Sequence, residues 1–397
     1  MRVLSKVLIV ASMVIFFTSC ATSITVRHLV PGEVDLSASR NIAVASTNAY
    51  KFPYGRPLSP WIQGLSETDF TLSSGYDTNL ASSVASTASR MILDSVQGTG
   101  YFTVLTPEVT DAYMTLSKVG ENTSAMLKSK GMQALLSSSI SYMDVEEQVV
   151  GRDNKEFVTE WVDPDTTDND PTLSSLVSYY KVTSREYFLV QKATLTLTYT
   201  IFDLGSGSIL FSRSFTGKED QETKIGIRTY DAGAPGGYRD ERRYSSGYAP
   251  SFKPLFEKII RSFSSTISKQ LAPSWQTKRL TLMSNKPKLE AAKGAYTLAE
   301  RGSYEAAYRQ FLSLYEGNGH IASGYNAALL LEAMGRFTEA VDLMNDVYNR
   351  SGSRQAYTAL LSMQEAKSQS EKAQRQISGE STHDGQGVMM MQYVVME

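Results

Sequence analysis

A set of six positions recurs 33 residues further along the chain, near its C-terminus. The first set is Leu298, Gly302, Tyr304, Ala307, Phe311 and Leu314, and the second is Leu331, Gly335, Phe337, Ala340, Met344 and Val347. A repeated unit of this length cannot bury its apolar face alone, so neighbouring units must stack on each other. The repeat therefore predicts an all-α segment at residues 276–376 built from stacked helical hairpins.

Each recurring residue type has a physical role in such a hairpin. Gly302 and Gly335 are expected at the turn between the paired helices, where a glycine can adopt backbone angles that other residues avoid. Ala307 and Ala340 are small, which allows the two helices to approach closely. Phe311 and its counterpart are expected to fill the groove between neighbouring pairs.

This order of small residue, aromatic residue and alanine resembles the tetratricopeptide repeat, although the usual tryptophan and closing proline are absent. The resemblance implies a groove that binds another protein or a peptide; an unrelated pair of helical hairpins is the alternative. We expect residues 354–376 to form a capping helix and 377–397 to form a flexible tail. The apolar stretch at 388–395 either packs back on the domain or offers a strand to a partner.

The first nineteen residues have the pattern of an export signal. Arg2 and Lys6 form a basic start, and an apolar run follows at 7–17. A helix that spans a bilayer needs about 20 apolar residues, so this run is too short for a permanent span.

The run ends at Cys20, which is the single cysteine of the chain. This placement resembles the lipobox of bacterial lipoproteins, with Phe17 where leucine is usual; a plain secretory signal is the alternative. The resemblance implies a thioether between Cys20 and diacylglycerol, an acylated amine, and anchoring in a membrane. Ala21 follows the cysteine, which by the same resemblance favours the outer membrane, facing either the periplasm or the cell surface.

The sequence between the anchor and the repeat predicts an α/β domain at 41–275, preceded by a segment at 20–40 that holds the anchor and a first strand. Residues 42–45 form a buried apolar run, and an amphipathic helical pattern occupies 78–96. Residues 194–201 alternate threonine with apolar residues, which is typical of a strand with one buried face. A glycine-containing turn at 203–208 and a partner strand follow, and a long amphipathic helix runs from Ser251 to Leu271.

This order resembles the periplasmic α/β domain of the curli-assembly lipoproteins. The resemblance implies a mixed sheet with covering helices, and a subunit of an oligomeric secretion channel as one possible function. The whole arrangement also resembles a group of uncharacterised bacterial lipoproteins, in which a Pro-x-Trp…Arg link precedes tetratricopeptide repeats. Here the link is Pro273, Trp275 and Arg279.

Two insertions are candidates for binding. The acidic stretch from Asp163 to Asp170 holds four aspartates, which suit either calcium or an ordinary solvated loop, and it lacks the spacing of an EF-hand. The second insertion, at 226–254, is rich in glycine, tyrosine and arginine, which suits either a binding loop or a surface loop without a partner. Its candidate residues are Arg228, Tyr230, Tyr238, Arg242, Arg243 and Tyr244.

Composition excludes several functions. One cysteine excludes an internal disulfide and a multi-cysteine zinc site, and a net charge of −2 argues against broad binding to nucleic acid. His28, His320 and His383 lie in no recognisable catalytic motif, and the adjacent Glu146 and Glu147 should point to opposite faces of a strand. We expect no cofactor, no metal and no enzymatic activity, although a hydrolase that uses only carboxylates remains a third alternative.

These observations together predict a lipid-anchored envelope scaffold or assembly factor. It would bind another envelope protein or peptide through its helical repeats, and would touch the membrane through its anchor. The sequence does not indicate its oligomeric state.

Overall fold

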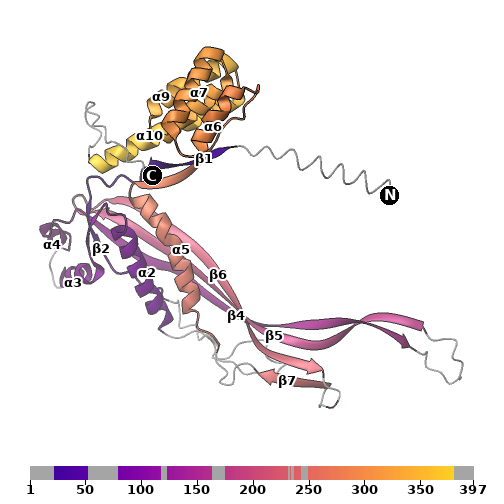
Figure 1. Cartoon of the computed structure of the whole chain (residues 1–397). Helices are drawn as coiled ribbons and strands as arrows, with labels where there is room; N and C mark the ends of the chain where they lie inside the picture. The colour runs from indigo at the N-terminus through magenta and orange to yellow at the C-terminus, as the bar shows by residue number, and fades with distance from the viewer. Residues whose placement is uncertain are drawn as a thin grey trace. The chain divides into compact units, whose positions relative to one another are not determined.

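The computed structural model describes residues 22–51, 79–117, 123–162, 175–230, 233, 237–242 and 249–379. The chain forms two compact units, which are shown in Figure 1 and are described separately. The sheet unit is Ser39–Ser268, and the helical unit combines Met1–Ala38 with Lys269–Glu397. The fold is thus an α/β structure with a mixed sheet, followed by an all-α helical repeat, as the sequence predicts.

The sheet unit is built on a six-stranded sheet with the order β3-β2-β4-β5-β6-β7. The parallel pairs β2–β3 and β2–β4 lie at one side, and the remaining neighbours are antiparallel. The strands are β2 (Asn41–Val44), β3 (Thr103–Leu105), β4 (Ala134–Val162), β5 (Ser175–Asp203), β6 (Ile209–Tyr230) and β7 (Tyr238–Arg242).

Helices α2 (Leu80–Gln97) and α5 (Lys253–Leu271) supply the apolar cover of this sheet, with the shorter α3 (Pro107–Ser117) and α4 (Thr123–Ser129) beside them. The two long helices are joined by a 2.8 Å contact between the hydroxyls of Ser95 and Ser264. In β5, Leu195 and Leu197 are fully buried, whereas the alternating threonines at 194, 196 and 198 remain partly exposed. The period-two pattern of the sequence is confirmed.

The central strands are longer than the sequence predicts. The expected strand at 194–201 is part of β5, which begins at Ser175, and β4 and β6 extend beside it to form the long antiparallel extension in Figure 1. The expected loop at 226–254 is partly wrong, because β6 runs to Tyr230 and β7 lies within it. Beyond Met143 these strands mix charged residues with apolar ones such as Val149 and Leu189, and they lack the long regular alternation that would mark their full length in the sequence.

The helical unit contains five successive α-helices and a two-stranded antiparallel ribbon among its described residues. The ribbon pairs β1 (Ser23–Val30) with β8 (Ser274–Thr281). The helices are α6 (Lys293–Glu300), α7 (Tyr304–Asn318), α8 (Ile321–Ala333), α9 (Phe337–Ser351) and α10 (Arg354–Ser378), with the short 3-10 helix η2 (Glu290–Ala292) before them. The strand near residue 24, which directly precedes the α/β segment in sequence, therefore belongs with the helices. The link at 273–279 forms most of its partner strand.

The helical repeat follows the predicted positions closely. Gly302 and Gly335 lie at the turns that end α6 and α8, with φ angles of 80° and 74°, and so need the freedom of glycine. Ala307 and Ala340 are completely buried near the start of α7 and α9. Among the described residues, no helix has the length and apolar character needed to cross a membrane.

Candidate functional site: the ribbon on the helical repeat

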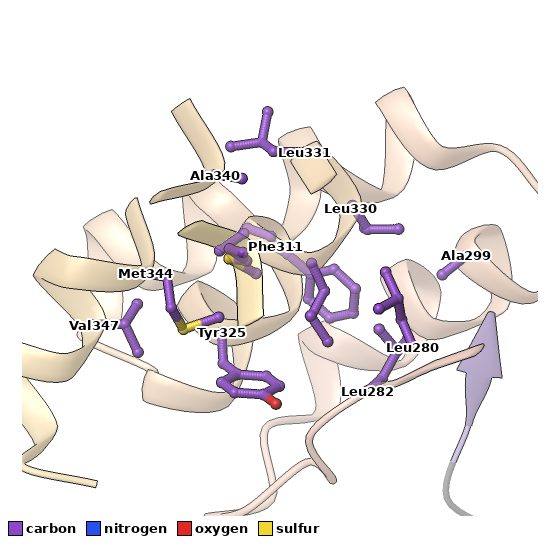
Figure 2. Close-up of a cluster of buried hydrophobic side chains, with 14 of the residues drawn as sticks. Leu280, Leu282, Ala299, Phe311, Tyr325, Leu330, Leu331, Ala340, Met344 and Val347 are labelled. Atoms are coloured by element: carbon purple, nitrogen blue, oxygen red, sulfur yellow. The ribbon is translucent and has the colours of Figure 1, made fainter. Parts of the chain in front are cut away.

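Helix α8 is the centre of the helical unit and is enclosed on all sides. Every residue from Ala322 to Glu332 is buried. On one side it packs against α7 and α9, where Phe311 and Met344 fill the space between the two hairpins (Figure 2). A helix with apolar contacts all round is an interior element, so α8 offers no free face to a partner.

The β1–β8 ribbon covers the other side of α8. Ile24 and Val26 of β1 join the same buried cluster as Leu330 of α8, and Leu280 of β8 lies beside them. Figure 2 shows Leu280 and Leu282 pointing into the core toward Leu330. β1 also contacts α6 and α10. The chain's own ribbon therefore covers parts of α6, α8 and α10.

Polar contacts hold the segment that follows β8 against α8. The buried side chain of Asn326 accepts a hydrogen bond from the Met283 amide at 2.7 Å and donates one to the Met283 carbonyl at 3.0 Å. The Tyr296 hydroxyl donates to the same carbonyl at 2.5 Å. Both backbone groups of Met283 are therefore satisfied by side chains of the repeat, which sets the register of the ribbon on the helices.

A charged cluster joins the ribbon to α8 and α10. Lys278 Nζ donates to Glu332 Oε1 at 2.7 Å and to Ser362 Oγ at 2.9 Å. His28 Nε2 lies 3.7 Å from the same carboxylate oxygen, and its ring meets Phe337 edge to face. Burial, assisted by Lys278, lowers the pKa of His28 to about 4, and burial raises the pKa of Glu332 above its usual value against the opposing effect of Lys278.

Both ends of the β1 segment are held by helices. After the strand, Gln376 of α10 accepts a hydrogen bond from the Gly32 amide at 2.8 Å and donates to the carbonyls of Gly32 and Val34. Before the strand, the Thr22 hydroxyl donates to Glu300 of α6 at 3.0 Å. These contacts bind the segment that follows Cys20 in sequence tightly to the helical unit.

The opposite face of the ribbon is exposed. Thr25, Arg27, Trp275, Thr277 and Arg279 alternate with the residues that contact the helices; we call these five residues the ribbon outer face. The Arg27 guanidinium lies 5.7 Å from the centre of the Trp275 ring, and Arg279 Nε donates to Ser23 Oγ at 2.7 Å. The indole is 47% exposed, so this face presents an aromatic ring beside Arg27, with Arg279 further along the ribbon.

Most of the predicted repeat residues pack in the interior of the repeat. Those that are fully or almost fully buried are Ala307, Phe311, Leu331, Ala340 and Met344. Leu298 and Tyr304 are partly buried against the same cluster, and Phe337 is partly buried with its ring against His28. Packing explains why their spacing recurs within the chain.

The structure places four of the predicted binding-loop residues on two paired strands. Arg228 and Tyr230 lie on β6, and Tyr238 and Arg242 lie on β7, with Tyr230 directly opposite Tyr238. Arg243 and Tyr244 lie outside the described residues, as do Cys20, the aspartates at 163–170 and the tail at 388–395.

Sequence reasoning missed the polar residues that hold the ribbon. Asn326 and Glu332 interrupt an otherwise apolar helix, at positions that a purely hydrophobic core would not favour. That interruption is the signal that could have located them, since polar residues buried in a core need partners. The described residues contain no group of three or more His, Cys, Asp or Glu side chains placed to hold a metal ion.

Comparisons with known proteins do not assign this chain to a family. No family model matches the chain, and no curated protein matches it. Two dodecameric structures of PelC from Paraburkholderia phytofirmans, one of them a point variant, align with 62% of this chain and 98% of theirs. The identities are 11% for the variant and 9% for the other, with TM-scores of 0.21 and 0.22. Scores this low do not establish a common fold.

Proposed function

We propose that this protein is a lipid-anchored envelope scaffold that holds another envelope protein or peptide through its helical unit. The observation that carries the proposal is the burial of β1 in the helical core. Ile24 and Val26 lie only four and six positions after Cys20 and pack among the repeat helices. A lipid on Cys20 would therefore hold the helical unit directly at the membrane, in the outer membrane if the resemblance at Ala21 applies.

The partner must use a surface of the helices that the β1–β8 ribbon does not cover. Helix α10 offers one: Tyr357 and Leu361 are one turn apart and are 46% and 48% exposed. The Tyr348 ring of α9 lies 5.3 Å from the Tyr357 ring and extends the apolar surface. Aromatic and aliphatic side chains of this kind are typical anchors at protein interfaces.

The test is crosslinking in the native envelope, with the protein recovered and its partner identified. We expect Tyr357→Ala combined with Leu361→Ala to abolish or strongly reduce recovery of the partner. A matched control is Val109→Ala with Leu116→Ala on α3, where the side chains are 41% and 53% exposed. Equal recovery from both double variants would contradict the proposed surface.

Lipid anchoring needs its own measurement. The mass of the N-terminal peptide of the purified protein should show Cys20 with its diacylglycerol and acyl chain, and Cys20→Ala should release the protein from the membrane fraction. An unmodified N-terminal peptide would contradict the anchor without bearing on the partner.

A second candidate function is a subunit of an oligomeric secretion channel. The observation that favours it lies in the sheet unit: within the described residues, β4 beyond Ser139 and β6 before Gly226 are paired along one edge each. Long open edges can accept strands from another chain. Ring-shaped oligomers in detergent and conductance in planar bilayers would support this function, whereas a stable monomer would contradict it.

A further inference from the structure

The ribbon outer face has the composition of a surface that binds anionic groups. Its charged members are Arg27 and Arg279, and the remaining members are Trp275 and two threonines. Among the contacts of the described residues, Arg27 lies over the indole and Arg279 bonds to a serine hydroxyl. The two guanidiniums thus retain charge and donor groups that no carboxylate in the described structure neutralises.

The ribbon itself is rigid enough to present these groups as a fixed array. Its inner residues are packed in the helical core, and its two ends are held by Gln376 and Glu300. Arg27 and Thr277 are directly opposite one another in the strand register, as are Thr25 and Arg279. The two arginines therefore project from the same face of neighbouring strands at adjacent register positions.

The chain length between the anchor and the ribbon limits where this face can lie. Only Ala21 and Thr22 separate Cys20 from Ser23, the first residue of β1. At about 3.5 Å per residue, the Cα of Ser23 is at most about 10 Å from that of Cys20. With Cys20 lipidated, the ribbon is held within reach of the lipid headgroups.

We propose that the ribbon outer face binds the anionic headgroups of the membrane in which Cys20 is anchored. Arg27 and Arg279 donate hydrogen bonds to lipid phosphate oxygens, a geometry to which guanidinium is well suited. Trp275 enters the interface between headgroups and acyl chains, where indole rings concentrate. This inference rests on the proposed lipid anchoring, because the anchor supplies the proximity.

The test uses the complete mature chain with Cys20→Ala, made without its leader, so that lipidation plays no part. Sedimentation with vesicles of phosphatidylcholine containing 30% phosphatidylglycerol measures the partition coefficient, and pure phosphatidylcholine vesicles measure the contribution of charge. We expect binding to the anionic vesicles, weakened by 0.5 M salt. Arg27→Gln with Arg279→Gln should reduce the partition coefficient on the order of tenfold.

The matched control is Arg301→Gln with Arg354→Gln, two exposed arginines of the same unit that change the net charge equally. It should bind like the unmodified chain, and melting curves should show that both double variants are folded. Equal vesicle binding by the two double variants, or equal binding to neutral and anionic vesicles, overturns the proposal.

The failure of this proposal can be distinguished from failure of the anchor. Normal lipidation of Cys20 with no vesicle binding by the lipid-free chain would remove the ribbon contact and leave the anchor intact. Conversely, vesicle binding that depends on the two arginines would support the ribbon contact even if the N-terminal peptide proved unmodified. If the arginine variant instead lost a crosslink to an envelope protein while vesicle binding stayed unchanged, the face would belong to a protein partner and the proposal would be wrong.

Discussion

Lys278 Nζ lies 2.7 Å from Glu332 Oε1, and this contact joins β8 to the centre of α8. The Glu332 side chain is 1% exposed and the Lys278 side chain is 33% exposed, so the pair lies at the edge of the core. A carboxylate that loses its partner at such a depth keeps its desolvation cost without compensation. The contact therefore makes the position of the ribbon on the repeat specific, which an apolar contact alone would not do.

Removing one member of this pair should destabilise the helical unit. We expect Lys278→Met to lower the free energy of unfolding by about 2 kcal/mol, because Glu332 then remains buried without its cation. Urea unfolding followed by circular dichroism measures the change. Glu305→Ala serves as the control, since its partners Arg309 and Arg336 are at the surface and exposed pairs contribute about 1 kcal/mol or less. Equal effects of the two changes would show that the buried pair is not special.

The free energy of unfolding should decrease as the pH is lowered, because of His28. Its pKa is about 4 in the folded chain and near 6.5 when unfolded, so between these values the unfolded state binds the proton and the folded state does not. The contribution of His28 is therefore complete above pH 6.5 and is lost as the pH falls toward 4, by about 3 kcal/mol in total.

Glu332 opposes this trend, because a raised carboxyl pKa favours the folded state as the pH falls. The informative quantity is therefore the difference in unfolding free energy between the unmodified chain and His28→Gln, measured at several pH values. As the pH is lowered from 6.5 to 4, the unfolding free energy of the unmodified chain should decrease steadily relative to that of His28→Gln. A constant difference over this range would show that His28 titrates normally in the fold.

Gly324 should tolerate no side chain. A Cβ placed there would lie 2.5 Å from Tyr315 Cδ2 and 2.7 Å from Val347 Cγ2, in the packed space between α7, α8 and α9. We expect Gly324→Ala to destabilise the helical unit by about 1–3 kcal/mol despite the better helix propensity of alanine. Gly317→Ala in α7 is the control, because nothing lies within 4 Å of its Cβ position, and it should be neutral or stabilising. Thermal unfolding of the two variants compares them directly.

The repeat could be predicted because its signals are local. Glycine turns, small residues at the helix contact and apolar spacing all lie within one unit, and Gly302 and Ala307 occupy their expected places. The pairing of β1 with β8 could not be predicted in this way. Its partners, such as Val26 and Lys278, are some 250 residues apart, and a short alternating run does not specify which strand it will pair with.

The same reasoning explains why the repeat pattern predicts the helices but not what packs against them. Repeat motifs record how helices pack on each other, and they carry no information about what covers the outside of the stack. Here Ile24 and Leu280, which precede and follow the intervening α/β segment, pack against the helices of the repeat. Only the assembled structure brings these two residues together.

Gln376 should hold the segment after β1 in place locally, with little effect on the stability of the whole unit. Its side chain is 7% exposed and completes three hydrogen bonds with the backbone of Gly32 and Val34, close to the end of α10. We expect Gln376→Ala to leave the Gly32 amide without its acceptor, so that hydrogen exchange at this amide becomes about tenfold faster or more. The neighbouring amide of Glu33, which donates to the Gln270 carbonyl at 2.7 Å, should be affected less. Gln369→Ala on the same helix is the control, because its amide bonds only to the exposed Glu365 one turn away. If the Gly32 amide exchanged at the same rate in both variants, Gln376 would not hold this segment.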